Sequence, residues 1–445
     1  MKKLISTLVA LTLVASLAGC SSQPSNSEQQ SSSEANASST ASEEPVVLKT
    51  MTFLTIGADD DTNPLAEAPL YFELFDEYTK LHPNVTFENT NTTQSFDEKL
   101  MAAFTSGNGP DLFWFSPGTL STYADNGLLQ PLDELVAGEN GIDYSDVYEG
   151  CLMHYKDQFY GWGPVTLAQV LYYNKDHFDE ANVEYPTDDW TWDDLMSAAE
   201  KLTVKDGDKV TRYGFQCDEY NRLFLSLLWS YGGEPFNDMS NPTEAVYNSP
   251  EGIKAATFMK DLVNTNGVAP MPGGQGALGY REAFQNGTSS MMVDVSWTIA
   301  GCTSTEGLNY GIALVPKGTE RGSWVAPSAW GISTQTKDLD LAWDVWKYIN
   351  SKDATLKLSY YGKYPAGQVP VWKSALEDPQ WEGNEIVDKV IQQLDTARIE
   401  PSFSNSNTWY WTNLPSGLQD MIINDRNPQE ALDEMCANDN TDFFS

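Results

Sequence analysis

The spacing of hydrophobic residues between positions 48 and 115 predicts strands that alternate with helices. Short runs of apolar and β-branched residues indicate strands at residues 48–56, 85–87 and 111–115. Apolar residues that recur every three to four positions indicate helices at residues 70–81 and 96–104. The order strand, helix, strand, helix, strand favours a mainly parallel sheet with helices on both faces, and such sheets bind ligands at the carboxyl ends of their strands.

The same two patterns continue toward the carboxyl terminus. Apolar runs predict strands at residues 170–173, 291–295 and 311–315, and a one-sided apolar pattern predicts an amphipathic helix at residues 341–349. Three helices are predicted to start where a capping residue is followed by a residue that favours the first helical turn. These pairs are Thr191 with Asp194, Ser249 with Pro250, and Asn427 with Pro428. We find no repeat with a period of about 20 to 50 residues, which argues against a solenoid or a propeller.

The first residues predict export from the cell. Two lysines precede an apolar run at residues 4–17, as in secretory signal peptides. This run of about 14 residues is too short for a membrane-spanning helix, which needs about 20. Residues 17–20, Leu-Ala-Gly-Cys, resemble the bacterial lipobox, in which the Cys sulfur receives a diacylglycerol and becomes the new amino terminus. We therefore predict a lipoprotein signal peptide at residues 1–19 and lipidation of Cys20.

Residues 20–45 predict a lipidated, disordered tether. Residues 21–45 hold ten Ser and no aromatic residue, so they cannot bury enough apolar surface to offset the entropy of ordering. A coil of this length has a root-mean-square span of about 25–30 Å. No later segment of the sequence reaches membrane-spanning length, so we expect the protein at the extracellular face of the cell membrane, held through its lipid only.

Composition narrows the class of protein further. Hydrophobic residues make up 41% of the chain and aromatic residues 12%, which is enough to build a folded core. The formal net charge of −37 repels phosphate backbones, so nucleic acid is excluded as a partner. The chain has three His and five scattered Cys, so we expect neither a metal site nor a cofactor.

Several motifs resemble the extracellular solute-binding proteins of carbohydrate ABC transporters, the family of maltose-binding protein. They fall in the family's order across nearly the whole mature chain: Ser-Gly-Asn-Gly-Pro-Asp-Leu at 106–112, Asn-Gly-Leu-Leu-Gln-Pro-Leu-Asp at 126–133, Tyr-Gly at 160–161, Leu-Tyr-Tyr-Asn-Lys-Asp-His-Phe at 171–178, Thr-Trp-Asp-Asp-Leu at 191–195, the Met-Met strand that leads to Trp297, and a Gly-to-Gly stretch at 311–318. Each motif is weak alone, but the set is specific together with the lipobox.

This resemblance implies an α/β fold of the periplasmic-binding-protein-like type II class, with two α/β lobes joined by a hinge and a ligand cleft between them. Residues 46–165 plus 332–365 would form lobe 1, and residues 170–328 plus 368–445 would form lobe 2. The lobes would close around a sugar or oligosaccharide by a hinge motion, and the closed form would deliver it to the permease subunits of an ABC importer. We expect a monomer that captures its ligand and is not an enzyme.

A sugar cleft needs flat rings for the C–H face of a pyranose and polar groups for its hydroxyl rim. Phe115 closes the strand at 111–115, where the family places a stacking ring, and Trp114 should point to the opposite face. Trp162 lies between two glycines, where a ring is poorly placed to fill a core. Trp297 ends the strand at 291–295 and matches the family's recurrent stacking Trp, so it is our first candidate.

Two further ring candidates lie later in the chain. Trp330 stands between Ala and Gly at the second inferred crossover between the lobes. Trp409, Tyr410 and Trp411 are consecutive, so no regular element can bury all three rings on one face. The family supplies a stacking platform here, and we expect Trp409 or Tyr410 to face the ligand.

The polar candidates are acids after the first strand and a pair near the expected rim of the cleft. Asp59 and Asp60, which precede Asp61, lie where the family places hydroxyl-binding acids, and carboxylates are strong hydrogen-bond acceptors. A solvated acidic loop or a calcium site is an alternative, although the spacing does not match an EF-hand loop. Asn221 and Arg222 fall near the rim.

Other functions and specificities stay open. Gly118 and Thr119 stand where maltose-type members present a charged pair, which puts maltodextrin specificity in doubt. A glycoside hydrolase would need two carboxylates about 5–10 Å apart; the 63 acids do not exclude such a pair, but we find no hydrolase motif. A binding protein for a cationic amine such as a polyamine would gain from acidity and aromatic rings. The sequence leaves disulfides among the later cysteines undecided.

Overall fold

The computed structural model describes residues 44–52, 68–92, 94–274, 278–325, 327–361, 364–365 and 368–445. The chain divides into two units, residues 1–43 and Glu44–Ser445, and everything described belongs to the second. The predicted signal peptide, Cys20, nearly all of the tether, and Asp59, Asp60 and Asp61 lie outside the described residues. In the part of the chain that the structure describes, no helix is both long enough and apolar enough to cross a bilayer.

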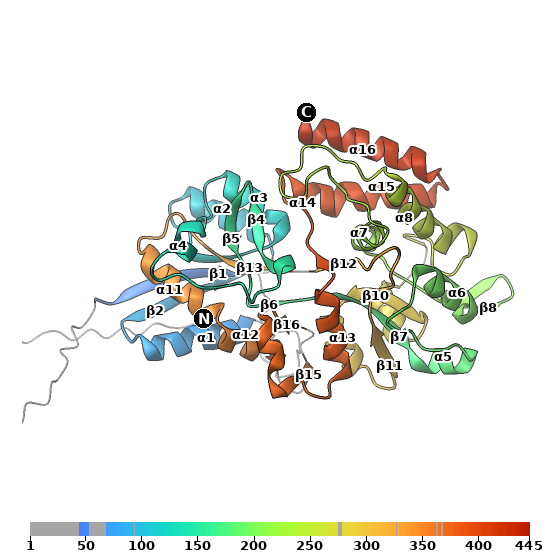
Figure 1. The fold of residues 1–445 in the computed structure, drawn as a ribbon, viewed down its shortest axis with the longest axis horizontal. Coiled ribbons are helices and arrows are strands. Elements are labelled where there is room, and N and C mark those ends of the chain that lie inside the picture. The colour runs from blue at the N-terminus through green and yellow to red at the C-terminus, as the bar shows by residue number, and fades with distance from the viewer. Residues whose placement is uncertain are drawn as a thin grey trace, which may run out of the picture. The chain divides into compact units, whose positions relative to one another are not determined.

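A four-stranded sheet with the order β13-β3-β1-β2 organises the first part of the fold (Figure 1). Its strands are β1 (Val46–Thr52), β2 (Val85–Asn91), β3 (Leu112–Phe115) and β13 (Ala329–Ile332). β1 runs parallel to β2 and β3, whereas β13 is antiparallel to β3. The helices α1 (Ala68–Leu81) and α2 (Phe96–Thr105) form the crossovers that parallel neighbours require. The predicted order of strands and helices is confirmed, and the fourth strand arrives from much later in the sequence.

Helices extend from the ends of this sheet. β3 leads into α3 (Pro117–Asp125), which starts with a capping box between Ser116 and Thr119. β13 is followed by α11 (Leu339–Ile349), the predicted amphipathic helix, whose Val345, Trp346 and Ile349 are buried. The other elements of this part are α4 (Asp133–Ala137), the 3₁₀ turn η1 (Glu149–Cys151), the hairpin of β4 (Met153–Tyr155) and β5 (Gln158–Gly161), and α12 (Lys352–Ser359).

A second sheet has the order β10-β7-β11. Its strands are β7 (Gln169–Asn174), β10 (Met291–Val295) and β11 (Tyr310–Ala313), and both outer strands are antiparallel to β7. All residues of β7 and β10 are buried, and most of them are apolar, so neither strand shows an alternation of apolar and polar residues. The three strands predicted here are confirmed. Helices beside this sheet are α5 (Lys175–Ala181), α6 (Trp192–Leu202) and α13 (Glu385–Leu394).

The predicted helix starts are confirmed by their hydrogen bonds. Thr191 and Asp194 form a capping box at α6, and the Ser249 side chain accepts from the backbone N–H of Gly252 at the start of α8 (Pro250–Lys260). Asn427 caps α16 (Pro428–Phe444) in the same way. The remaining helices and helical turns are α7 (Tyr220–Ser230), the π-helical η2 (Asp261–Thr265), α9 (Tyr280–Gln285), α10 (Thr298–Ser304), the 3₁₀ turns η3 (Lys373–Glu377) and η4 (Pro379–Trp381), α14 (Ser406–Thr408), the π-helical η5 (Trp409–Asn413) and α15 (Leu414–Ile423).

Short strand pairs connect these parts. β6 (Val165–Thr166) pairs with β16 (Val369–Pro370), so two chain segments run side by side between the two larger sheets. β12 (Ser323–Trp324) pairs with β17 (Ala397–Arg398). The other pairs are β8 (Val204–Asp206) with β9 (Lys209–Arg212), and β14 (Tyr360–Tyr361) with β15 (Tyr364–Pro365).

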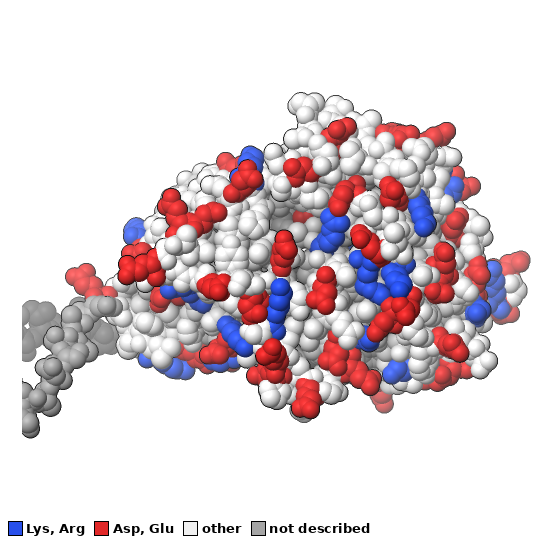
Figure 2. Space-filling model, in the orientation of Figure 1, with Lys and Arg blue, Asp and Glu red and all other residues white. Residues whose placement is uncertain are grey.

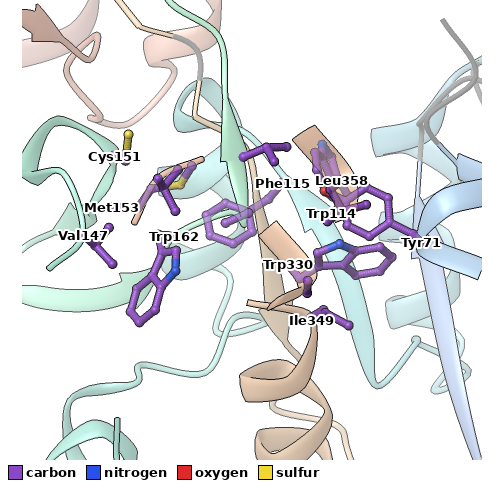
Figure 3. Packing of buried hydrophobic residues seen from close by; sticks show 14 of the residues in the cluster. Tyr71, Trp114, Phe115, Val147, Cys151, Met153, Trp162, Trp330, Ile349 and Leu358 are labelled. Atoms are coloured by element: carbon purple, nitrogen blue, oxygen red, sulfur yellow. The ribbon is translucent and has the colours of Figure 1, made fainter. Parts of the chain in front are cut away.

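Buried hydrophobic side chains form two clusters. The first surrounds the four-stranded sheet, and Figure 3 shows several of its members, among them Trp114 and Trp330. The second lies around α6, α7 and α15. β7 contributes Tyr172 to the first cluster and Leu171 to the second, because neighbouring side chains of a strand point to opposite faces. Since one strand serves both clusters, the lobe boundaries that we infer from the sequence remain predictions.

The described cysteines form no disulfide, and the described acids, His and Cys form no metal site. The cysteines at positions 151, 217, 302 and 436 are free and buried. Within the described ranges, no group of three or more His, Cys, Asp or Glu side chains is placed to hold a metal ion.

Candidate ligand-binding site

Trp162 lies in the core and not at a surface. Its ring is fully buried and packs edge-on against Trp346, at 4.9 Å between ring centroids, and against Trp372. The expectation that its two flanking glycines keep it out of a core is wrong. Gly163 passes so close to the backbone of Ser328 that a Cβ would lie 1.6 Å from the Ser328 carbonyl oxygen. Gly161 adopts a φ of 114°. The glycines permit the tight turn that brings the ring into the core.

Trp330 is also a core residue, and its predicted contact with a ligand stays a prediction. It is fully buried and lies 5.6 Å from Trp114 and 5.5 Å from Phe75, measured between ring centroids. Figure 3 shows Trp114 beside Tyr71 and Trp330, with Phe115 on the side of Trp162. This matches the expected alternation along the strand. Phe115 is only 1% exposed, so its contact with a ligand stays a prediction.

A hollow of about 390 Å³ opens at the carboxyl end of β3, where parallel sheets bind ligands. It is lined by Ser95, Phe96, Asp97, Glu98, Trp114, Phe115, Ser116, Thr119 and Asn407. Asn407 comes from α14, far along the sequence, and a Cβ on Gly118 would lie 2.9 Å from its Oδ1 atom. Any larger residue at position 118 would therefore require Asn407 to move.

Two serine side chains join α3 to the segment before α14. The hydroxyl of Ser121 donates to the carbonyl oxygen of Phe403 at 2.7 Å, and that of Ser402 donates to the carbonyl oxygen of Pro117 at 2.9 Å. Both serines are buried. These bonds bring the carboxyl end of β3 next to the chain segment that carries the three consecutive rings.

Among the three consecutive rings, the exposed one is Trp411. Trp409 is fully buried against Phe236, 4.8 Å away between ring centroids, and Tyr410 is 1% exposed and stacks on Trp324. Trp411 keeps 50% of its surface exposed. The prediction that one ring stays out of the core is confirmed. Trp409 and Tyr410 are both buried in the π-helical turn η5, so the ligand contact predicted for one of them stays a prediction.

Asn221 and Arg222 hold this segment from the first turn of α7. Asn221 is buried, and its amide Nδ2 donates to the carbonyl oxygen of Tyr410 at 3.0 Å. The guanidinium of Arg222 lies 4.0 Å from the ring centroid of Trp324 and 5.2 Å from that of Trp411. It also forms an ion pair with Glu219. Both predicted rim residues therefore contact the segment of consecutive rings.

Trp297 lies at the other end of the same charged group of residues. It is partly buried, and the guanidinium of Arg281 lies 4.9 Å from its ring centroid. Arg281 donates through Nε and Nη2 to the two carboxylate oxygens of Asp294, at 2.6 and 2.8 Å. It donates through Nη2 to Glu219 as well, at 3.0 Å. The ring is thus positioned by a guanidinium that two carboxylates hold in place.

The charges of this site are matched inside the protein. Two guanidinium groups, of Arg222 and Arg281, pair with two carboxylates, of Glu219 and Asp294. A further acid, Glu400, accepts a hydrogen bond from Trp324 Nε1 at 2.6 Å. Burial raises the pKa of Glu400, against the lowering effect of its hydrogen bonds. The site therefore offers aromatic surface without an unpaired arginine for an anionic ligand.

A family model described as "Bacterial extracellular solute-binding protein" matches residues 73–389, which is more than half of the chain. The chain belongs to this family. Among curated relatives, this solute-binding protein is 25% identical over 343 residues to the galactooligosaccharide-binding protein of Bacillus subtilis, covering 74% of our chain and 76% of that protein. It is 23% identical to the maltotriose-binding protein of Pyrococcus abyssi, covering 75% and 70%.

Solved structures confirm the fold of the solute-binding protein. An ABC substrate-binding protein of Listeria monocytogenes in complex with cycloalternan aligns with a TM-score of 0.73 at 22% identity, covering 89% of our chain and 99% of that one. The predicted type II periplasmic-binding-protein-like fold is therefore correct, with its two α/β lobes and a hinge.

Several residues of the solute-binding protein's site are missing from the sequence-based prediction. They are Glu219, Arg281, Asp294, Trp324 and Trp411. One signal was available, because Asp294 is a lone acid inside an apolar strand, and a buried carboxylate needs a partner. Trp324 lies in a two-residue strand without any local pattern, so only the tertiary structure reveals it.

Proposed function

We propose that this solute-binding protein captures an uncharged oligosaccharide and delivers it to the permease of an ABC importer, while a lipid on Cys20 holds it at the outer face of the membrane. The names of its relatives support the ligand class, since they bind a galactooligosaccharide and maltotriose. The lipobox at residues 17–20 supports the anchor.

One observation carries the proposal. Two partly exposed indoles, Trp297 and Trp411, belong to a single group of paired charges built from separate parts of the chain. A pyranose offers an apolar C–H face to such rings and hydroxyl groups to the neighbouring polar atoms. Aromatic surface beside neutralised charges suits a ligand that is polar but uncharged.

The rings are unsuited to a cationic amine. A cation binds the face of an aromatic ring through the ring quadrupole. At Trp297 and Trp411 the chain's own guanidinium groups, of Arg281 and Arg222, already take part in this interaction. A second cation would have to compete with the arginine for the ring. The net acidity of the chain therefore attracts an amine only at long range. Figure 2 shows Asp and Glu spread over the visible face, between fewer Lys and Arg.

The same pairing argues against a glycoside hydrolase. A hydrolase needs one carboxylic acid that can donate a proton and one free carboxylate. Glu219 and Asp294 are both held by arginine, and Glu400 is buried beneath Trp324. We propose capture without turnover.

A binding screen tests the ligand class. Purified protein is heated with maltose to maltohexaose, with galactobiose to galactotetraose, with an oligogalacturonide and with spermidine. A ligand at about 100 times its Kd should stabilise the fold by roughly 2.7 kcal/mol. We expect stabilisation by a neutral oligosaccharide only, confirmed by calorimetry. Stabilisation by spermidine alone would reject the proposal, and so would release of smaller sugars in proportion to protein and time.

A substitution tests the anchor. Cys20→Ala removes the sulfur that would receive the lipid, so we expect the variant to take up no labelled fatty acid in growing cells, while the unmodified chain becomes labelled. Cys151→Ala serves as the control, because its thiol is buried in the folded unit. Equal labelling of both variants would contradict lipidation at Cys20.

A further inference from the structure

Glu219 occupies a position between the two arginines of the site. One of its carboxylate oxygens pairs with Arg222, and the other accepts from Arg281 Nη2 at 3.0 Å. Glu219 is also the residue before the first turn of α7, yet its side chain makes no capping hydrogen bond. Its carboxylate is therefore committed to the two guanidinium groups and not to the helix.

Each of these guanidinium groups touches a partly exposed indole. Arg222 lies 5.2 Å from the ring centroid of Trp411, and Arg281 lies 4.9 Å from that of Trp297. A continuous path of contacts thus runs from Trp411 through Arg222, Glu219 and Arg281 to Trp297. Among the described residues, Glu219 is the one carboxylate that this path contains between the two rings.

The two arginines depend on Glu219 to different degrees. Arg281 keeps a second carboxylate, Asp294, which it contacts at 2.6 Å. Arg222 forms no other ion pair among the residues that the structure describes, and only 12% of its side chain is exposed. A buried guanidinium that loses its counter-charge has to find a new partner or move toward water. Either change would alter the present contact between Arg222 and the ring of Trp411.

We infer that Glu219 is a positioning residue that fixes the placement of the Trp297 and Trp411 rings relative to each other. The effect of Glu219 on ligand affinity rests on the proposed function. A saccharide long enough to stack on both rings gains affinity only if their spacing fits its sugar units. A short saccharide on one ring gains nothing from that spacing. Glu219 therefore sets how steeply affinity rises with chain length.

The first test needs no ligand. Indole ¹H–¹⁵N signals of the free protein are assigned with Trp→Phe variants and compared with those of Glu219→Gln. We expect the signals of Trp297 and Trp411 to shift together. The matched control is Glu234→Gln, which breaks a similar ion pair, of Glu234 with Arg398 at 2.7 Å, beside the buried Trp229.

The control should move the Trp229 signal and leave Trp297 and Trp411 in place. If Glu219→Gln moves neither signal, or only one of them, the coupling through Glu219 is wrong. If Glu219→Gln does not fold, Glu219→Asp gives the same comparison, because it keeps the charge but shortens the reach. We then expect smaller shifts of the same two signals.

The second test measures Kd against chain length for the maltose to maltohexaose and galactobiose to galactotetraose series. In Glu219→Gln we expect the longest bound member to lose about tenfold in affinity, roughly the energy of one aromatic stacking contact. The shortest bound member should change by less than about threefold. An equal loss at every length would overturn the inference. If no saccharide binds while both indole signals shift, the proposed function fails and the coupling through Glu219 stands.

Discussion

Replacing Trp411 and Trp409 by Ala, one at a time, tests which of these two rings binds the ligand and which supports the core. Trp411 is 50% exposed, whereas its near neighbour Trp409 is fully buried. Both rings lie in the π-helical turn η5, so the two variants disturb the same backbone. Trp411→Ala should weaken ligand binding more than it destabilises the fold, whereas Trp409→Ala should destabilise the fold more than it weakens binding.

The magnitudes follow from these exposures. A sugar that covers the exposed half of Trp411 removes on the order of 100 Å² of apolar surface from water, which corresponds to about 2.5 kcal/mol. This free energy is an upper value, and it corresponds to a rise in Kd of roughly 70-fold. Trp409→Ala instead removes a core indole next to Phe236, and such changes cost about 3–5 kcal/mol of unfolding free energy.

The assay pairs two measurements on each variant. Calorimetric titration with the saccharide found in the screen gives Kd, and urea unfolding of the free protein gives stability. We expect Trp411→Ala to raise Kd at least about tenfold and to lose clearly less unfolding free energy than Trp409→Ala, because only half of the Trp411 side chain is buried. If Trp411→Ala destabilises the fold as much as Trp409→Ala does, or if its Kd is unchanged, the assignment of Trp411 as a platform is refuted.

Three further predictions concern other parts of the molecule. Trp297→Ala should raise Kd by more than about tenfold and lower the melting temperature of the free protein less than Trp409→Ala does, since the Trp297 ring is only partly buried; equal loss of stability would favour a core role. Burial raises the pKa of Glu400 above its value in the unfolded chain, so the unmodified protein loses stability as this carboxyl ionises with rising pH. The melting temperature of Glu400→Gln should therefore rise relative to that of the unmodified protein between about pH 4 and about pH 8. A constant difference between the two melting temperatures would contradict this. Gly163→Ala should lower the unfolding free energy by about 1–3 kcal/mol, because its Cβ would meet the Ser328 carbonyl oxygen at 1.6 Å. Urea unfolding measures this loss against Gly279→Ala, a glycine with a negative φ and open space around its Cβ position.

The sequence determined the local structure of this protein. The capping residues at Thr191 and Asn427 start helices where they were expected to, and the apolar runs at 170–173 and 291–295 are buried strands. These features depend on contacts between residues a few positions apart, so a short stretch of sequence contains their cause. The family motifs reach further, since they indicated the fold class that the structural comparisons confirm.

The tertiary structure alone decided which rings are available to a ligand. Trp162, Trp330 and Trp409 are all Trp in promising positions, yet each is fully buried by segments distant in the sequence. Trp411 is the exposed ring because distant segments, among them Phe236 and Trp324, cover Trp409 and Tyr410. Glu219 became important because the fold brings Arg281, from a separate helix, to the start of α7. Exposure and charge pairing depend on contacts between distant segments, and no local pattern of residues contains that information.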